Sequence, residues 1–203
     1  MAANPTSRRV QAAEQTRELI LRAALERFTA DGYAKATVND IAKAAGVVVA
    51  TVYTSVGGKP VLLEHLVRQG VQDADVTETL RKVAVATTGR EVIDLIAAGT
   101  GSTYRRHRAV IELLLDTAAS EPSARRLLAA ANSSYRAAIG TVAARIATLG
   151  ALADGVDEAR ATDVLWYLFG IWSWPRLLRD ATWTADEAES WLRETAARTL
   201  LRP

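Results

Sequence analysis

The chain of 203 residues contains no cysteine, which excludes disulfide bonds and thiolate metal sites. It has only two histidines, His65 and His107, and they lie far apart in the sequence. A metal site built from closely spaced histidines is therefore not expected. We predict that the protein uses no metal and no cofactor.

Long hydrophobic runs are also missing. No stretch of about eighteen apolar residues is free of charge, and no apolar segment of a secretory signal follows Arg8 and Arg9. Apolar residues still make up 49% of the chain, enough for a sizeable core. These features lead us to expect a soluble, unexported protein of the cytoplasm with no membrane partner.

An excess of one charge is nearly absent as well, because the formal net charge is +2 and the isoelectric point is about 9.1. The distribution is more informative than the total. Residues 1–60 carry eight Lys and Arg against five Asp and Glu, a balance of +3, whereas residues 61–203 carry a balance of −1. This asymmetry is expected if the first part of the chain neutralises phosphates and the remainder serves another purpose.

The sequence shows no arrangement of residues typical of catalysis. It lacks a nucleophile with an adjacent base, a paired His and carboxylate metal motif, and a glycine-rich phosphate loop. Glu64 with His65, or His107 with Asp116, could do acid–base work, so an enzyme on a helical scaffold remains a distant alternative. We expect no catalytic residues and no enzymatic activity.

The sequence instead contains repeated helical patterns. Apolar residues from Leu19 to Phe28 recur at helical spacing and predict a first helix over 14–31, which Asp31 and Gly32 end. The preceding residues, 1–12, are small and polar and predict a flexible N-terminal arm. Arg8 and Arg9 on this arm are either solvated charges or contacts to a DNA minor groove.

A helix, a glycine turn and a second short helix follow over 37–53, an arrangement that can place a helix in the major groove of DNA. Gly46 stands where the turn needs a positive φ, and Ala42 allows the two helices to cross closely. Thr37 is a suitable N-cap, and Asp40 three residues later favours the same helix start.

The second helix of this motif conflicts with local propensity. Residues 47–56 are rich in β-branched side chains and by themselves would indicate a buried strand. Because every other segment indicates helix, a lone strand would have unpaired backbone groups. We therefore predict a helix here, ended by Gly57 and Gly58.

Further helices are expected in the rest of the chain, where Pro175 should end or kink the penultimate helix and Thr184 with Glu187 should cap the last one. Their predicted ranges are 59–79, 90–107, 109–119, 123–149, 157–179 and 185–201. The predicted fold class is all-α with about nine helices. The predicted domains are an arm at 1–12, a helix-turn-helix domain at 13–58 and an effector-binding and dimerisation domain at 59–203.

Residues from Thr16 to Leu63 resemble the TetR-like (tetracycline repressor) family of transcriptional regulators. The matching positions are Ile20, Ala23, Ala24, Phe28, Asp31, Gly32, Tyr33, Thr37, Ile41, Ala42, Ala45, Gly46, Val47, Thr51, Val52, Tyr53, Lys59 and Leu62. The resemblance implies a homodimeric regulator that binds a double-stranded DNA operator and responds to a small-molecule effector. We expect a repressor that the effector releases from its operator, paired with its copy through the last two helices.

The resemblance also implies which residues contact DNA. Thr37 and Lys59 would bind phosphates, and the remaining candidates would face the backbone or the base edges. These candidates are Tyr33, Val48, Val49, Ala50, Thr51, Tyr53 and Thr54. The chain departs from the family at Val48, usually serine, at Ala50, commonly glycine, and at Val56, usually aromatic. These departures predict recognition through van der Waals contacts, phosphates and DNA shape, or weakened DNA binding.

Polar and aromatic side chains of the second domain are candidates for the effector pocket that the resemblance implies. They are Tyr104, His107, Ile111, Asn132, Tyr135, Trp166, Phe169 and Trp172. The alternative for each is an ordinary place in the core or at a subunit interface. A third interpretation of the whole chain is a TetR-like fold that has become a ligand-binding or interaction module.

Overall fold

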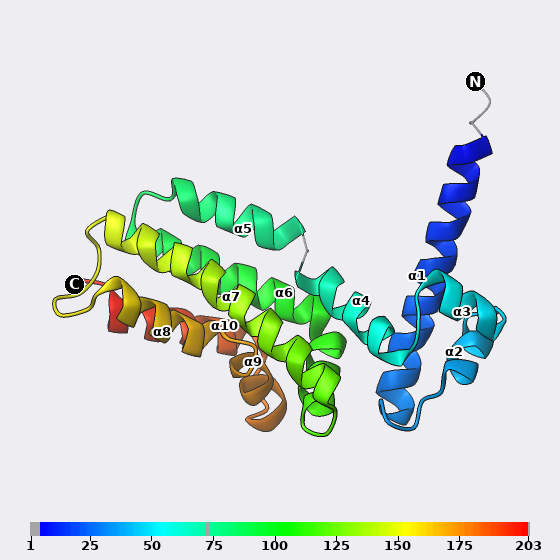
Figure 1. The fold of residues 1–203 in the computed structure, drawn as a ribbon. Coiled ribbons are helices and arrows are strands. Elements are labelled where there is room, and N and C mark those ends of the chain that lie inside the picture. The colour runs from blue at the N-terminus through cyan, green and yellow to red at the C-terminus, as the bar shows by residue number, and fades with distance from the viewer. Residues whose placement is uncertain (1–4, 72–73, 203) are drawn as a thin grey trace. The chain divides into compact units, whose positions relative to one another are not determined.

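The computed structural model describes residues 5–71 and 74–202, and most of these residues are helical. Nine helices of seven or more residues confirm the predicted all-α fold within this part of the chain (Figure 1). They are α1 (Pro5–Asp31), α2 (Val38–Ala44), α3 (Val49–Ser55), α4 (Lys59–Val71), α5 (Ala74–Val85), α6 (Gly89–Ala118), α7 (Pro122–Thr148), α8 (Glu158–Phe169) and α10 (Ala185–Leu200). A three-residue helix, α9 (Ser173–Pro175), and a π-helix, η1 (Arg176–Asp180), lie between α8 and α10.

The chain divides into two compact units. The first contains residues 1–69 and 109–128, and the second contains residues 70–108 and 129–203. The division therefore passes through α6 and α7, each of which contributes residues to both units.

The core of the first unit forms where α2 and α3 pack on the C-terminal half of α1 (Figure 1). Ile20 and Phe28 of α1, Ile41 of α2 and Val52 of α3 are almost fully buried there. Leu62 of α4 is equally buried. Since α2 and α3 have seven residues each, packing and not intrinsic propensity accounts for their stability. The β-branched segment predicted as helix is indeed helical from Val49 to Ser55.

Helix α1 begins earlier than the sequence predicted. It extends back to Pro5, so residues 5–12 are helical where an irregular arm was expected, and residues 1–4 lie outside the described part. Pro5 suits the first position of a helix because its missing N–H would have no partner there. Residues 9–12 are exposed, with Val10 at 65%, in agreement with the absence of apolar periodicity there.

Helix α6 is continuous, which corrects the prediction of two helices at 90–107 and 109–119. The predicted break at residue 108 does not occur, and Gly99 and Gly101 also lie inside the helix. A Cβ at Gly99 would lie 2.6 Å from Oγ1 and Cγ2 of Thr79 on α5. Glycine at this position therefore permits the close approach of α5 to α6 and does not end the helix.

Two further predicted helices are shorter than expected. The predicted helix at 59–79 is two helices, α4 and α5, between which residues 72 and 73 lie outside the described part. The predicted helix at 157–179 ends at Phe169, six residues before Pro175, which was expected to end or kink it. At Gly170 the backbone becomes extended and leaves the helical path. A Cβ at this position would collide with the carbonyl oxygen of Trp166.

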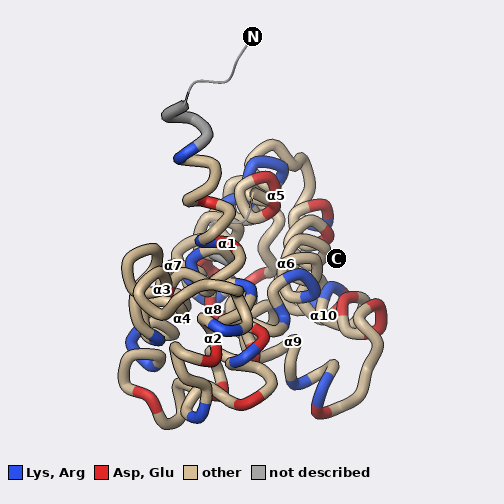
Figure 2. The backbone as a smooth tube through the Cα atoms, turned by 90° about the vertical axis from the view of Figure 1, so that its right-hand side faces the viewer, with Lys and Arg blue, Asp and Glu red and all other residues tan. Residues whose placement is uncertain are grey.

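No helix within the described ranges is both long enough and apolar enough to span a membrane. Positions of both charges are interspersed along the described helices, as Figure 2 shows for the backbone.

Candidate functional site

The helix-turn-helix motif is built from α2 and α3, and the predicted start of α2 is confirmed. The Thr37 hydroxyl accepts a hydrogen bond from the Asp40 N–H at 3.2 Å, and the Asp40 carboxylate accepts one from the Thr37 N–H at 3.2 Å. The hydroxyl also donates to this carboxylate at 2.5 Å. These bonds to the Thr37 hydroxyl and N–H hold the pKa of Asp40 below its usual value.

The turn between the two helices depends on Gly46, whose φ of +69° lies in the left-handed region. The N–H of Val47 donates to the carbonyl of Ala42 at 3.0 Å, and this bond closes the turn. Ala42 itself is buried, as its proposed role at the helix crossing requires. This turn packs α3 against α2 and leaves the opposite side of α3 exposed to solvent.

The outer side of α3 carries the predicted DNA-contacting residues. Val48 and Tyr53 are 69% and 55% exposed, Ala50 and Thr54 are exposed, and Val49 and Thr51 are half-buried. The Thr54 hydroxyl donates to the Ala50 carbonyl at 2.9 Å. This surface offers methyl groups, a phenol and few polar side chains to a partner.

The N-terminus of α3 has no side-chain cap. Val48 occupies the N-cap position in an extended conformation and makes no capping hydrogen bond. Serine at this position would accept a bond from the helix backbone, so valine gives up that stabilisation. The departure from the family at Val48 therefore leaves α3 without a side-chain cap.

Lys59 and Tyr33 lie next to each other and already have partners. The Lys59 ammonium donates to the Ala34 carbonyl at 3.2 Å and lies 4.7 Å from the centre of the Tyr33 ring. Tyr33 is 8% exposed and packs on Phe28, and burial followed by the charge of Glu121 raises its pKa. Both residues thus join the end of α1 to the start of α4, in addition to any role toward phosphate.

Comparison with known families assigns this domain. The sequence profile of the family described as bacterial regulatory proteins, tetR family, matches residues 20–66, which include α2, the Gly46 turn and α3. Over residues 20–66 the chain therefore has the sequence of a TetR-family domain. This segment contains the helix-turn-helix of a DNA-binding regulator of that family.

Solved structures of the same fold cover almost the whole chain. NalD of Pseudomonas aeruginosa, the secondary repressor of the MexAB-OprM multidrug efflux pump, is 23% identical over 95% of this chain and 98% of its own, with a TM-score of 0.77. SmeT of Stenotrophomonas maltophilia, solved with triclosan, is 20% identical over 93% and 92%, with a TM-score of 0.78. No curated protein matches the chain significantly.

A third solved structure has bound choline. It is a putative transcriptional regulator from Saccharomonospora viridis, 18% identical over 94% of this chain and 100% of its own, with a TM-score of 0.74. At these identities the likeness of all three structures establishes the fold of the chain and not its ligand.

The second unit brings several of the predicted pocket residues together in pairs. Trp166 donates from Nε1 to Asn132 Oδ1 at 3.0 Å, and Tyr135 donates from its hydroxyl to the Phe169 carbonyl at 2.7 Å. Burial raises the pKa of the Tyr135 phenol. Tyr104, which is 2% exposed, stacks on Trp174 with ring centres 6.0 Å apart.

The remaining predicted pocket residues occupy different surroundings. Trp172 is 42% exposed and meets the edge of Trp166 at a ring distance of 6.4 Å. His107 is half-buried on α6. Ile111 is also half-buried on α6 but belongs to the first unit, whereas the other seven candidates belong to the second.

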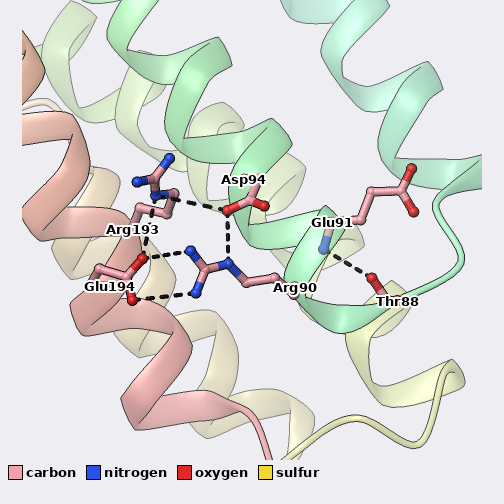
Figure 3. A network of polar contacts seen from close by, with 6 residues as sticks. All are labelled: Thr88, Arg90, Glu91, Asp94, Arg193 and Glu194. Carbon is pink, nitrogen blue, oxygen red and sulfur yellow. Dashed lines mark hydrogen bonds and ion pairs between the residues drawn. The ribbon is translucent and has the colours of Figure 1, made fainter.

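A polar network connects the start of α6 with α10 in the same unit (Figure 3). Arg90 donates to Glu194 at 2.5 and 3.3 Å and to Asp94 at 3.0 Å. Arg193 lies 3.6 Å from Glu194 and 3.9 Å from Asp94. The hydrogen bond from Arg90 is the main reason that the pKa of Glu194 is lowered. This network connects α10 to α6 through partly exposed side chains.

Sequence reasoning did not select Trp174 as a site residue. Trp174 is 2% exposed and contacts Tyr104, whereas the neighbouring Trp172 was selected and is largely exposed. The alternation of two tryptophans on either side of Ser173 was a signal that one of them faces inward. No group of three or more residues suited to metal binding occurs within the described residues.

Proposed function

We propose that the protein is a ligand-responsive transcriptional regulator, a homodimeric repressor that a small molecule releases from its operator. The observation that carries this proposal is the capped α2, the Gly46 turn and the exposed outer side of α3, within a segment that matches the TetR family. In this proposal 13–58 is the DNA-binding domain, and 59–203 binds the effector and forms the dimer.

The DNA contacts follow from the exposed positions. The N-terminus of α2 at Thr37 and the side chains of Tyr53, Thr54 and Thr51 would meet the backbone and the base edges. Methyl groups of Val48, Val49 and Ala50 would face thymine methyl groups. Lys59 and Tyr33 would support this surface, and Lys59 would add a phosphate contact.

Dimerisation is supported by exposed aromatic side chains near the end of the chain. Tyr167 on α8 is 74% exposed and Trp191 on α10 is 46% exposed, and these two helices lie side by side (Figure 1). Aromatic residues at such positions are typical of an interface core. A two-fold axis at α8 and α10 would bury them and would present two recognition helices to half-sites one DNA turn apart.

Release by an effector is supported by the similar solved structures, two of which contain triclosan and choline. For release to occur, the effector must bind the DNA-incompetent arrangement better than the competent one. A rival function, a ligand-binding module with weak DNA affinity, is favoured by the missing cap at Val48.

The test is fluorescence anisotropy with DNA from upstream of the protein's own gene, over a series of salt concentrations. We expect sequence-preferring binding whose affinity falls steeply with salt, with a slope of about −0.9 for each phosphate neutralised. Tyr53→Ala combined with Thr54→Ala should weaken binding. The control is Thr29→Ala, since Thr29 makes the same type of hydroxyl bond to its own helix, α1, at 2.8 Å. Equal loss in both variants, or no salt-dependent binding, would contradict the regulator function.

Oligomeric state is tested separately by light scattering. We expect a dimer at micromolar concentration that Tyr167→Glu converts to a monomer, because a carboxylate cannot be buried there without a partner. A monomeric wild-type protein that still binds its operator would contradict the proposed dimer.

A further inference from the structure

The indole N–H of Trp174 is a buried donor with no hydrogen-bond acceptor among the described residues. More than about nine in ten buried polar groups in proteins have a partner, and an unpaired one costs about 1–3 kcal/mol. The only other such donor in the described part, Arg193 Nε, lies 3.6 Å from a Glu194 oxygen and 3.9 Å from an Asp94 oxygen. Trp174 therefore differs from every other buried side-chain donor that the structure describes.

Two other aromatic donors in the second unit have hydrogen-bond acceptors supplied by the protein. The indole of Trp166 donates to Asn132, and the phenol of Tyr135 donates to the Phe169 carbonyl. Both are aromatic side chains with satisfied polar atoms. The unpaired N–H of Trp174 is thus a local exception within a cluster whose other donors have acceptors supplied by the protein.

The surroundings of Trp174 are flat and apolar on one side. The Tyr104 ring lies 6.0 Å away and is inclined by only 18° to the indole. A Cβ at Gly101 would lie 2.9 Å from Trp174 Cη2, so the indole edge lies against the backbone of α6. Glycine at this position makes room for the indole, and the ring faces around it are flat, a shape that stacks on planar partners.

The charges near Trp174 already neutralise each other. A Cβ at Gly101 would also lie 2.9 Å from Glu189 Oε2, and Glu189 pairs with Arg105 at 3.4 Å. A charged ligand would have to share these partners or be buried without one, which is costly. A neutral ligand has no such requirement.

We infer that Trp174 Nε1 is the anchoring donor for the effector, and that the effector is a neutral, planar, largely apolar molecule with a hydrogen-bond acceptor on its edge. The inference rests on the proposed function, because it names the ligand class of the proposed effector domain. The bond satisfies the one buried indole N–H that lacks an acceptor among the described residues, and the apolar body of the ligand lies beside Tyr104. A site with a committed donor rejects an isosteric molecule that lacks the acceptor.

Quinoline and naphthalene provide a matched pair of probes, because they have the same shape and only quinoline carries an acceptor nitrogen. The full-length protein is labelled with ¹⁵N, and the indole N–H signals of its five tryptophans are followed during titration. We expect quinoline to move the Trp174 signal and to bind about tenfold more tightly than naphthalene, the factor that corresponds to about 1.4 kcal/mol.

Two variants make the assignment specific. Trp174→Phe keeps an aromatic ring but removes the donor, so both probes should bind it equally. Trp166→Phe is the control, since its N–H already bonds to Asn132, and it should keep the tenfold preference. Measurement on the wild-type protein gives the answer by itself if Trp174→Phe fails to fold.

Three results would overturn the inference: equal binding of the two probes by the wild type, quinoline binding that leaves the Trp174 signal in place, and no binding of either probe up to its solubility. Operator binding is measured in parallel without probes. Intact operator binding with an unresponsive Trp174 refutes the inference alone, whereas a responsive Trp174 with no operator binding refutes the regulator function alone.

Discussion

Replacing Gly99 by alanine tests whether glycine inside α6 serves the contact with α5. The added methyl group would lie 2.6 Å from Thr79 Oγ1 and Cγ2 and 3.1 Å from Thr79 Cβ. Ordinary carbon contacts are about 3.5–4.0 Å, so one of the two helices must shift. The Thr79 hydroxyl donates to the Asp75 carbonyl at 2.8 Å, which holds the side chain in place.

The expected magnitude combines two opposing effects. Overpacking of this kind costs about 1–3 kcal/mol, whereas alanine in place of glycine stabilises a helix interior by about 1 kcal/mol. Gly99→Ala should therefore change the free energy of unfolding by between about 0 and 2 kcal/mol in the destabilising direction. For a chain of this size, 1 kcal/mol corresponds to about 2–4 °C in Tm.

Gly140→Ala is the matched control, because Gly140 lies inside α7 in the same unit and a Cβ there would have no neighbour within 4 Å. This variant should gain about 1 kcal/mol from helix propensity alone. The assay is urea unfolding followed by circular dichroism. The two variants should differ by about 1–3 kcal/mol, which is the cost of the contact itself.

The reasoning would be refuted if Gly99→Ala were as stable as Gly140→Ala. A second check uses Thr79→Ala in the Gly99→Ala background, since it removes the two side-chain atoms at 2.6 Å. The pair should be less destabilised than the sum of the single changes. Strict additivity would show that the two residues do not interact.

Three further predictions concern the first unit. Val48→Ser should stabilise it by about 0.5–2 kcal/mol in urea unfolding, because serine supplies the missing cap of α3 and no buried contact is lost; an unchanged or lower midpoint would contradict this. Burial, followed by the charges of Arg17 and Arg68, lowers the pKa of His65 in the folded protein below its ordinary value of 6.5. The neutral imidazole therefore contributes stability above about pH 6.5, and this contribution is lost as the pH falls through the pKa of the folded state. His65→Gln should therefore reduce the fall in urea midpoint between pH 7.5 and 5.5, and an equal fall in both proteins would disprove the assignment. Deleting residues 1–12 should leave operator affinity and salt slope unchanged, because residues 5–12 continue α1; a slope lowered by about 2 would instead indicate two phosphate contacts.

The sequence by itself determined the features that depend on a few neighbouring residues. Thr37 with Asp40 and Thr184 with Glu187 cap their helices as predicted, since a capping box involves residues only three positions apart. Gly46 adopts the expected positive φ for an equally local reason. The assignment of α3 as a helix needed more, because its β-branched composition had to be weighed against the helical pattern of the whole chain.

Only the tertiary structure decided the features that depend on distant residues. Gly99 and Gly101 look like turn residues in the sequence, but both lie inside α6. They are glycines because Thr79 and Trp174 come too close to the backbone of α6 to leave room for a side chain. Likewise, the sequence offers no distinction between Trp172 and Trp174, whereas the structure exposes the first and buries the second. Contacts between residues far apart in the chain determine how closely two helices approach and which side chains are buried. These contacts cannot be predicted from the pattern of neighbouring residues.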